Sequence, residues 1–193
     1  MAHELWHPSL SLALHRNRQS LQSRFVQLAT VRKDGRPAVR TVVFRGLLGE
    51  SHRLGFATDA RSVKVDELHA SPWVEACWYF PITREQFRLS GTMTLIGPET
   101  TDPVAREARE RIWREMSEES RLSYTWPDPG RAREPSRPFP TEPPDADAPL
   151  PHYCLLVLDV QEVDHLELTG NPQHRWRYTQ DASGRWTGVE VNP

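Results

Sequence analysis

Short runs of strand-forming residues, separated by turn signals, constrain the fold of this chain more than any other feature. The runs Phe25–Val31 and Ala38–Arg45 flank the turn sequence Lys33–Pro37, and this pattern predicts a β-hairpin. Further runs follow at Leu54–Thr58, Trp73–Phe80, Gln86–Ile96, His152–Leu168, Arg175–Gln180 and Arg185–Val191, the last two joined by the turn Asp181–Gly184. This order predicts a mainly β (α+β) fold of seven or eight antiparallel strands, arranged as a barrel or a sandwich.

Three segments have the pattern of helices that would lie around such a sheet. Pro8 suits a first helical turn, and apolar residues then recur at helical spacing within the first 22 residues. Ser62 is placed to cap a short helix that ends at Ala70. The segment Pro103–Glu119 predicts a charged helix with a solvated face and ion pairs between residues four apart.

The prolines gather in one place. Nine of the 17 prolines lie in the segment Pro127–Pro151, which therefore cannot form a helix or a central strand and is expected to be an extended surface loop. The roughly 40 residues that follow are too few for an independent domain. We therefore expect one domain over residues 1–193, with a Pro-rich insertion at 127–151.

Composition excludes several classes of function. The chain has 24 Lys and Arg against 26 Asp and Glu, so a broad basic surface for nucleic acid is not expected. No apolar run approaches the roughly 20 residues of a membrane span, and the start of the chain lacks a signal-peptide apolar segment. A cytoplasmic protein without membrane or nucleic-acid partners is expected. Cys77 and Cys154 lie in apolar runs and are interpreted as small buried side chains.

One local motif points to a metal, but its context does not fit. His3-Glu4-Leu5-Trp6-His7 matches the H-E-x-x-H pattern, in which a helix presents both histidines to a zinc ion. Pro8 disfavours the helical conformation at His7, and only two residues precede His3. The sequence therefore predicts no metal site. It also lacks the glycine-rich phosphate-binding motifs and the serine-hydrolase motif.

Cations and small hydroxyl residues occur at the ends of the apolar strands. Arg40 interrupts one strand and Arg45 ends it, while Thr58 ends the next strand and Arg61-Ser62-Val63-Lys64 opens a helix. Hydroxyls, helical N–H groups and cations placed together would form an anion site, suited to a phosphate. The alternative is that these cations simply lie on a solvated rim of the sheet.

Several of these segments together resemble the pyridoxamine 5′-phosphate oxidase-like flavoproteins. The resemblance covers the hairpin Phe25–Arg45 and continues through Phe56–Asp59, Arg61–Lys64 and Arg84–Gly91. Asn17-Arg18, Trp126–Gly130 and Leu168–Pro172 resemble one branch of that family, the Alr4036-type proteins, named for a cyanobacterial FMN-binding domain. The resemblance implies a split β-barrel with peripheral helices, forming a homodimer that binds FMN at the subunit interface.

The resemblance also implies roles for individual residues. The flavin and its phosphate would be lined by Arg40, Thr41, Val42 and Val43, with Arg45 at the flavin or substrate end of that strand. The FMN phosphate would be held by Thr58, Ser62 and Lys64. Gln86 and Arg175 would contact the flavin ring from the partner chain, and His174 is the one candidate for an acid or base.

The sequence departs from the family pattern where the oxidases hold their substrate. Val63 stands where the family usually has an arginine, a loss for which Arg61 could compensate. Ser117–Arg121 lacks the R-P-x-x-S pattern, and Pro172-Gln-His174 replaces R-L-H. The expected function is therefore an FMN-dependent oxidoreductase acting on an unidentified small substrate. The alternatives are a true pyridoxine/pyridoxamine 5′-phosphate oxidase, a non-catalytic flavin-binding module, and a relative that binds haem or a deazaflavin.

Overall fold

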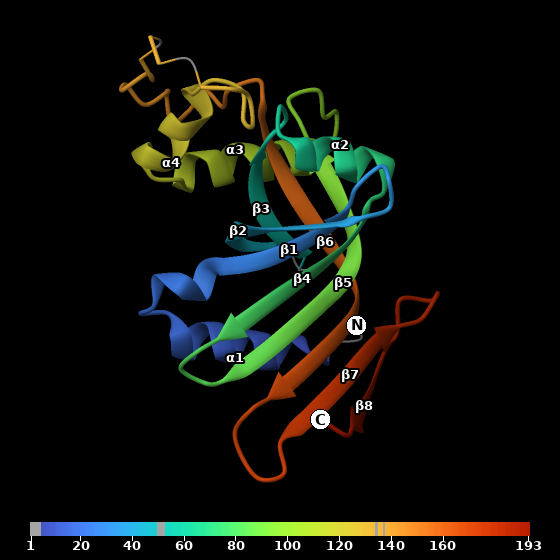
Figure 1. Ribbon diagram of the computed structural model, residues 1–193. Helices are drawn as coiled ribbons and strands as arrows, with labels where there is room; N and C mark the ends of the chain where they lie inside the picture. Colours follow the sequence, from blue (N-terminus) through green and yellow to red (C-terminus); the bar gives the residue numbers. More distant parts are fainter. Residues whose placement is uncertain (1–4, 50–52, 134, 137) are drawn as a thin grey trace.

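Six strands close into an antiparallel barrel. The computed structural model describes residues 5–49, 53–133, 135–136 and 138–193. The strands are hydrogen-bonded in the order β3-β2-β1-β4-β5-β6, and β6 pairs back with β3, which closes the ring (Figure 1). Their bounds are β1 Phe25–Val31, β2 Pro37–Leu48, β3 Arg53–Asp59, β4 Trp73–Phe80, β5 Glu85–Ile96 and β6 Tyr153–Glu167. The mainly β fold is confirmed, and the barrel is the correct alternative rather than the sandwich.

The long strand β6 pairs with β5 along one edge and has two successive partners along its other edge. Its first half pairs with β3, from Tyr153 opposite Asp59 to Leu158 opposite Leu54. Its second half pairs with β7 (His174–Gln180), which in turn pairs with β8 (Trp186–Val191). The β7–β8 hairpin therefore extends away from the barrel, as Figure 1 shows in red.

Strands β5 and β6 approach each other closely at an irregularity in their pairing. The register shifts between Ser90 and Gly91. A Cβ atom on Gly91 would lie 2.0 Å from the carbonyl oxygen of Asp159, so only glycine fits. This bulge bends both long strands around the core.

The core fills the barrel with inward-facing residues, which alternate with outward-facing residues along each strand. Leu28, Trp78, Phe87 and Leu156 are fully buried and belong to one apolar cluster. The indole Nε1 of Trp78 donates a 2.9 Å hydrogen bond to the carbonyl of Ser23, so this large side chain is buried without an unmet polar group.

Helices surround the barrel at both ends. α1 (His7–Asn17) lies at the end opposite α2 (Val63–Ala70), and α3 (Pro103–Glu115) and α4 (Glu118–Leu122) lie together near α2 (Figure 1). Two short 3₁₀ helices, η1 (Leu21–Arg24) and η2 (Ser123–Thr125), precede β1 and follow α4. His3 and Glu4 of the H-E-x-x-H motif lie outside the described residues. His7 begins α1, so the expectation that Pro8 keeps His7 out of a helix was wrong, because proline is tolerated in the first helical turn.

The sequence-based prediction was wrong in detail for two helices. The single helix Pro103–Glu119 ends at Glu115 instead, because Ser117 starts α4, its Oγ accepting a hydrogen bond from the Ser120 N–H. Ser62 does precede α2, but its hydroxyl does not cap that helix; it donates to the Asp59 carbonyl at 2.7 Å.

The charged helix α3 is not solvated all round. Arg111 and Glu115 form the expected surface pair, at 3.1 Å. Arg109, however, is buried, and it donates hydrogen bonds to the carbonyls of Tyr153 and Leu150. This arginine therefore anchors α3 to the start of β6.

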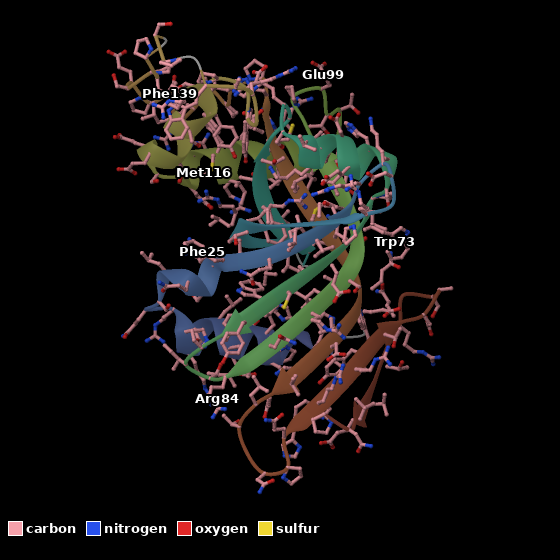
Figure 2. All side chains as sticks on the ribbon, in the orientation of Figure 1. Phe25, Trp73, Arg84, Glu99, Met116 and Phe139 are labelled. Carbon is pink, nitrogen blue, oxygen red and sulfur yellow. The ribbon has the colours of Figure 1, made fainter. Side chains whose placement is uncertain are left out.

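The described residues of the Pro-rich segment 127–151 contain neither helix nor strand, as predicted. The segment is held against α3: the indole of Trp113 donates to the Asp145 carbonyl at 2.9 Å, and Arg114 pairs with Asp147 at 2.7 Å. In Figure 2, Phe139 lies within this loop, beside α4.

Among the described residues, no helix is long and apolar enough to cross a membrane. Both cysteines are free thiols. Cys154 is buried as predicted, but Cys77 is only partly buried, because it lies on the outer side of β4 opposite Arg88.

Candidate anion-binding site

A lysine and two hydroxyls meet where β3 leads into α2. The Nζ of Lys64 donates to Thr58 Oγ1 at 2.9 Å and to Ser62 Oγ at 3.0 Å. The two hydroxyl oxygens lie 3.4 Å apart, and both side chains are buried. Strand β3 positions Thr58, the turn before α2 positions Ser62, and the first turn of α2 positions Lys64. These three side chains, from seven consecutive positions, form the group that we call the Lys64 cluster.

The electrostatics of this cluster favour an anion. Burial lowers the pKa of Lys64, and the positive charge of Arg40 lowers it further, against weaker opposing effects of Asp59 and Glu67. A negative group beside Nζ would reverse this penalty on the charged amine. The positive end of the α2 dipole lies at the same place and acts in the same direction.

Arg40 lies near Lys64 but is already paired. Its NH2 contacts Glu67 Oε2 at 2.6 Å, and its NH1 hydrogen-bonds Thr30 Oγ1. Burial would raise the pKa of Glu67, but the hydrogen bonds from Thr30 and Arg40 outweigh it, so the pKa is lowered. Arg40 is therefore held in a fixed orientation by α2.

Arg45 is partly buried and does not end its strand as predicted, because β2 continues to Leu48. Its Nε is buried and has no hydrogen-bond partner among the described residues. Burial lowers the pKa of this guanidinium, and Tyr124 and Tyr153 lie close enough to affect it. Arg45 therefore retains an N–H donor that no described residue uses.

Arg61 does not join the Lys64 cluster. It pairs with Asp59 at 2.6 Å and with Asp128 at 3.1 Å, and it donates to the carbonyls of Tyr124 and Trp126. Two carboxylates thus balance its charge at the base of the Pro-rich loop, and its role as a replacement for the cation missing at Val63 stays a prediction. A cavity of about 550 Å³ lies between Arg61 and that loop.

The other predicted residues of β2 point to both sides of the sheet. Val42 is buried in the barrel core, whereas Thr41 is exposed and Val43 is half-buried on the outer side. Their pairing with β1 fixes this alternation, with Thr41 opposite Gln27 and Val43 opposite Phe25.

Gln86 and Arg175 lie near each other but, within one chain, away from the Lys64 cluster. Both lie opposite Leu166, one on each side of β6, and β7 is at the other end of the molecule from α2 (Figure 1). Arg175 binds Asp164 with two hydrogen bonds, at 2.9 and 2.7 Å, and Asp164 also accepts from Arg88 at 2.9 Å. Burial would raise the pKa of Asp164, but these two arginines outweigh it and lower the pKa.

His174 is exposed at the start of β7. Its Nδ1 lies 2.8 Å from Glu190 Oε1, and its ring stacks on Trp176 with the centroids 5.5 Å apart. Within one chain it is not near the Lys64 cluster, since β7 and α2 lie at opposite ends (Figure 1).

Sequence reasoning missed the residues that hold the predicted ones in place. Glu67 and Thr30 orient Arg40, and Asp164 orients Arg175. Each of these residues is about ten or more positions from its partner in the chain, so no local spacing could have indicated the pairing.

Comparison with known proteins identifies the family of the chain. Residues 3–97 match the family model described as "Pyridoxamine 5′-phosphate oxidase, FMN-binding domain". A pyridoxine/pyridoxamine 5′-phosphate oxidase 2 from Arabidopsis thaliana is 38% identical over 193 residues, covering 97% of this chain and 96% of that protein. A pyridoxine/pyridoxamine 5′-phosphate oxidase from Hyphomonas neptunium is 31% identical, covering 89% of this chain and 78% of that protein.

Solved structures support the same assignment. A pyridoxamine 5′-phosphate oxidase-related, FMN-binding protein from Nostoc punctiforme has a TM-score of 0.95 and 46% identity, and the alignment covers 100% of both chains. PhzG from Burkholderia lata, solved in complex with tetrahydrophenazine-1-carboxylic acid, has a TM-score of 0.73 with 18% identity, covering 97% of this chain and 91% of that chain. The latter likeness concerns the fold alone. Barrel, sequence and whole-length relatives together show that the chain belongs to the pyridoxamine 5′-phosphate oxidase family and carries that family's FMN-binding domain.

Proposed function

We propose that this chain binds FMN and that the Lys64 cluster holds the FMN phosphate. The observation that carries the proposal is the convergence of Lys64 Nζ, Thr58 Oγ1 and Ser62 Oγ within 3.4 Å of one another at the start of α2. A partly desolvated ammonium with two hydroxyl donors suits a phosphate dianion. Membership of a family with an FMN-binding domain supports the identity of the ligand.

The remaining residues fit a flavin beyond the phosphate. Arg45 offers the buried, unpartnered Nε described above, and Arg40 is held rigidly beside Lys64 by Glu67. FMN, when bound, supplies hydride transfer at its ring N5. The chain's own contribution is to bind the phosphate, orient the ring and exclude water around it.

A second copy of the chain is part of the proposal. Apolar side chains are exposed on the outer side of β1, β2 and β4, and this outer sheet face comprises Phe25 (41% exposed), Val39 (70%), Trp73 (52%) and Tyr79 (42%). Phe25 and Trp73 are labelled on these strands in Figure 2. Exposed apolar surface of this kind favours association between copies. A partner copy would also bring its own Gln86 and Arg175 to a flavin held on the Lys64 cluster.

The reaction we propose is an FMN-dependent oxidation or reduction of a small substrate. We leave the substrate unassigned, because Ser117–Arg121 and Pro172–His174 lack the patterns with which the oxidases of this family bind their substrate. Oxidation of pyridoxine or pyridoxamine 5′-phosphate is the second candidate, and it is favoured by the Arabidopsis relative, which carries that name and aligns over 96% of its length.

The phosphate site can be tested with the two lysines of the chain, Lys33 and Lys64. Lys64→Ala removes a charge-assisted contact to the phosphate, which contributes about 1.5–3 kcal/mol. FMN affinity, measured by quenching of flavin fluorescence, should therefore fall about tenfold to hundredfold. Lys33→Ala, in the exposed β1–β2 turn, is the matched control and should bind as wild type. Equal FMN affinity in both variants would show that the phosphate lies elsewhere.

The chemistry is tested separately with the flavin-loaded protein. Anaerobic mixing with NAD(P)H or with a candidate substrate should bleach the flavin absorption band, and oxygen should restore it. Incubation with millimolar pyridoxine 5′-phosphate distinguishes the second candidate, because it alone predicts formation of pyridoxal 5′-phosphate. A flavin that no reductant bleaches would identify a non-catalytic binding module, and a Soret band in the purified protein would identify a haem protein.

A further inference from the structure

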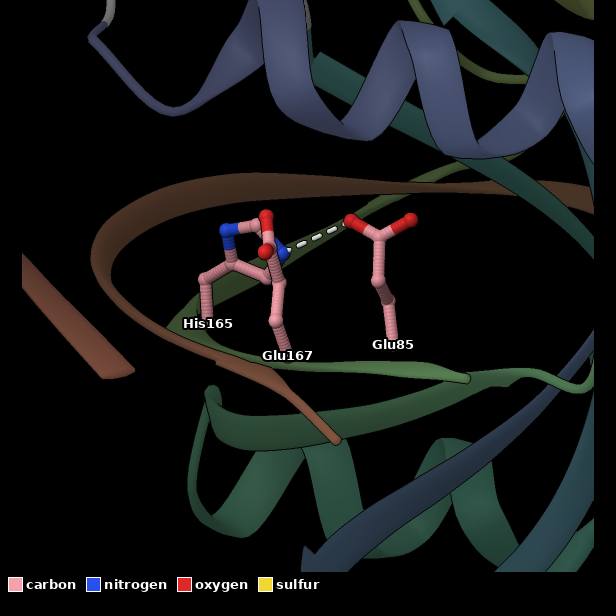
Figure 3. Close-up of side chains that lie close together, drawn as sticks. All are labelled: Glu85, His165 and Glu167. Carbon is pink, nitrogen blue, oxygen red and sulfur yellow. Dashed lines mark hydrogen bonds and ion pairs between the residues drawn. The ribbon is translucent and has the colours of Figure 1, made fainter. Parts of the chain in front are cut away.

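A histidine and two glutamates converge at the end of the barrel that α1 covers. Glu85 begins β5, and His165 and Glu167 lie near the end of β6. One potential ligand atom from each lies within 4.8 Å of the other two. Figure 3 shows the two carboxylates directed toward the edge of the imidazole ring, below the α1 ribbon. We call these three residues the Glu85–His165–Glu167 cluster.

The strand geometry brings these three side chains to one face. In a β-strand, residues two apart point to the same side, so the spacing His165-Leu166-Glu167 presents an imidazole and a carboxylate together. Glu85 lies directly opposite Glu167 in the antiparallel register of β5 and β6. Two ligands from one strand and a third from its neighbour form a simple three-residue metal site.

Without a bound cation, the closeness of these two carboxylates is unfavourable for folding. Glu85 and Glu167 are like charges at directly opposed positions, which destabilises an antiparallel pair. A cation between the two carboxylates would remove the repulsion.

His165 is held as a metal ligand would be. The side chain is 1% exposed, and its ring stacks on Phe87 with the centroids 4.0 Å apart and the planes at 10°. Its Nε2 lies 2.9 Å from Glu85 Oε2, while the buried Nδ1 has no partner among the described residues. The imidazole is thus fixed in orientation with Nε2 directed at Glu85, and Nε2 is the nitrogen that a cation beside that carboxylate would contact.

The cluster is also accessible. A cavity of about 440 Å³ is lined by Glu85, Glu167, Thr83, Thr169 and Arg16, so an ion and its remaining water ligands have a route in. We propose that Glu85, His165 and Glu167 bind one divalent transition-metal cation, at a site separate from the flavin site. One imidazole with two carboxylates suits Zn²⁺ or Mn²⁺ better than Ca²⁺ or Mg²⁺, which prefer oxygen ligands alone.

The test is a titration of Zn²⁺ into the whole chain after treatment with a chelator, with the binding measured by isothermal titration calorimetry. Wild type should bind Zn²⁺, and Glu167→Gln should bind it at least tenfold more weakly. Glu167 is only partly buried, so this variant should fold, as circular dichroism would verify; His165→Ala would instead open a gap beside Phe87. Glu162→Gln, on the opposite side of the same strand, is the matched control and should bind as wild type.

Two further variants distinguish metal binding at this cluster from a purely structural role and from binding at the N-terminal histidines. Arg16→Gln removes a positive charge that lines the cavity and should tighten Zn²⁺ binding several-fold, an effect not expected if the cluster has only a structural role. A double change, His3→Gln with His7→Gln, removes the histidines of the H-E-x-x-H motif and should leave the affinity unchanged. Wild-type affinity in Glu167→Gln, or a loss confined to the double variant, would overturn the proposal. Neither outcome bears on FMN binding.

Discussion

Charged side chains at the α2 end of the barrel are oriented by short ion pairs and hydrogen bonds. Arg40 and Glu67 form a 2.6 Å ion pair in which the glutamate side chain is 6% exposed. A buried carboxylate of this kind stabilises the fold only while its partner is present, because the loss of either charge leaves the other poorly solvated.

Glu67→Gln should therefore destabilise the protein by roughly 3 kcal/mol. The substitution keeps the shape of the side chain but leaves the Arg40 guanidinium without its counter-ion. Guanidinium chloride unfolding, followed by tryptophan fluorescence, would measure the change. Glu107→Gln, on the exposed side of α3, should stay within about 0.5 kcal/mol of wild type. Equal losses in both variants would contradict the argument.

The same pair predicts a pH dependence. Because folding lowers the pKa of Glu67, its contribution to stability is fully present above its unfolded pKa and is lost as the pH falls through the folded value. The difference in unfolding free energy between wild type and Glu67→Gln should be constant from about pH 6 to 8 and shrink below about pH 4.5, the ordinary pKa of a glutamate. A difference that grows on acidification would have the wrong sign for this mechanism.

At this scale the sequence predicted local groupings and missed distant ones. Thr58, Ser62 and Lys64 could be grouped because they lie within seven positions at a strand–helix junction. The pairs Arg40–Glu67 and Arg175–Asp164 depend on strand register and helix placement, which no short motif encodes. Arg61 pairs with Asp59, two positions away, and also with Asp128 of the Pro-rich loop, and only the second of these pairings lies beyond the reach of local sequence.

At the scale of elements, the bulge between β5 and β6 determines how these two strands bend. Gly91→Ala would place a methyl group against the Asp159 carbonyl, which is backbone and cannot move aside cheaply. We expect a loss of roughly 3 kcal/mol or more in unfolding free energy. Gly97→Ala is the control, since its added Cβ would meet only the Cys154 sulfur, at 3.8 Å. Similar denaturation midpoints for the two variants would show that the strands can separate at Gly91 without penalty.

The elements themselves were largely predictable. β1 and β4 begin and end at the expected residues, because alternating apolar side chains and flanking turns define them locally. The break between α3 and α4 was missed, because the Arg and Glu spacing continues through it while Ser117 starts a new helix. The buried role of Arg109 was also missed, because its carbonyl partners are 41 and 44 residues away.

At the scale of the whole molecule, the outer sheet face is where we propose that two copies meet. Val39→Lys places a charge in the middle of this face and should convert a dimer into a monomer in sedimentation experiments. Because the proposed flavin site uses residues of both copies, the FMN affinity of Val39→Lys should fall when the dimer is lost. Val104→Lys, on α3, begins from the same 70% exposure and should leave the dimer intact. A Val39→Lys protein that sediments like wild type would exclude this face.

The change of partner along one edge of β6, from β3 to β7, has a consequence for how the molecule opens. Residues 153–158 are hydrogen-bonded into the closed ring, so their amides can exchange with solvent only when the barrel itself comes apart. Residues 162–167 have the β7–β8 hairpin on one side instead, and that hairpin can peel away while the ring stays shut. The two halves of this one strand are therefore expected to open with different free energies, the half that faces the β7–β8 hairpin more easily. His165 and Glu167 of the Glu85–His165–Glu167 cluster lie in that half, so a ligand bound there would slow its opening.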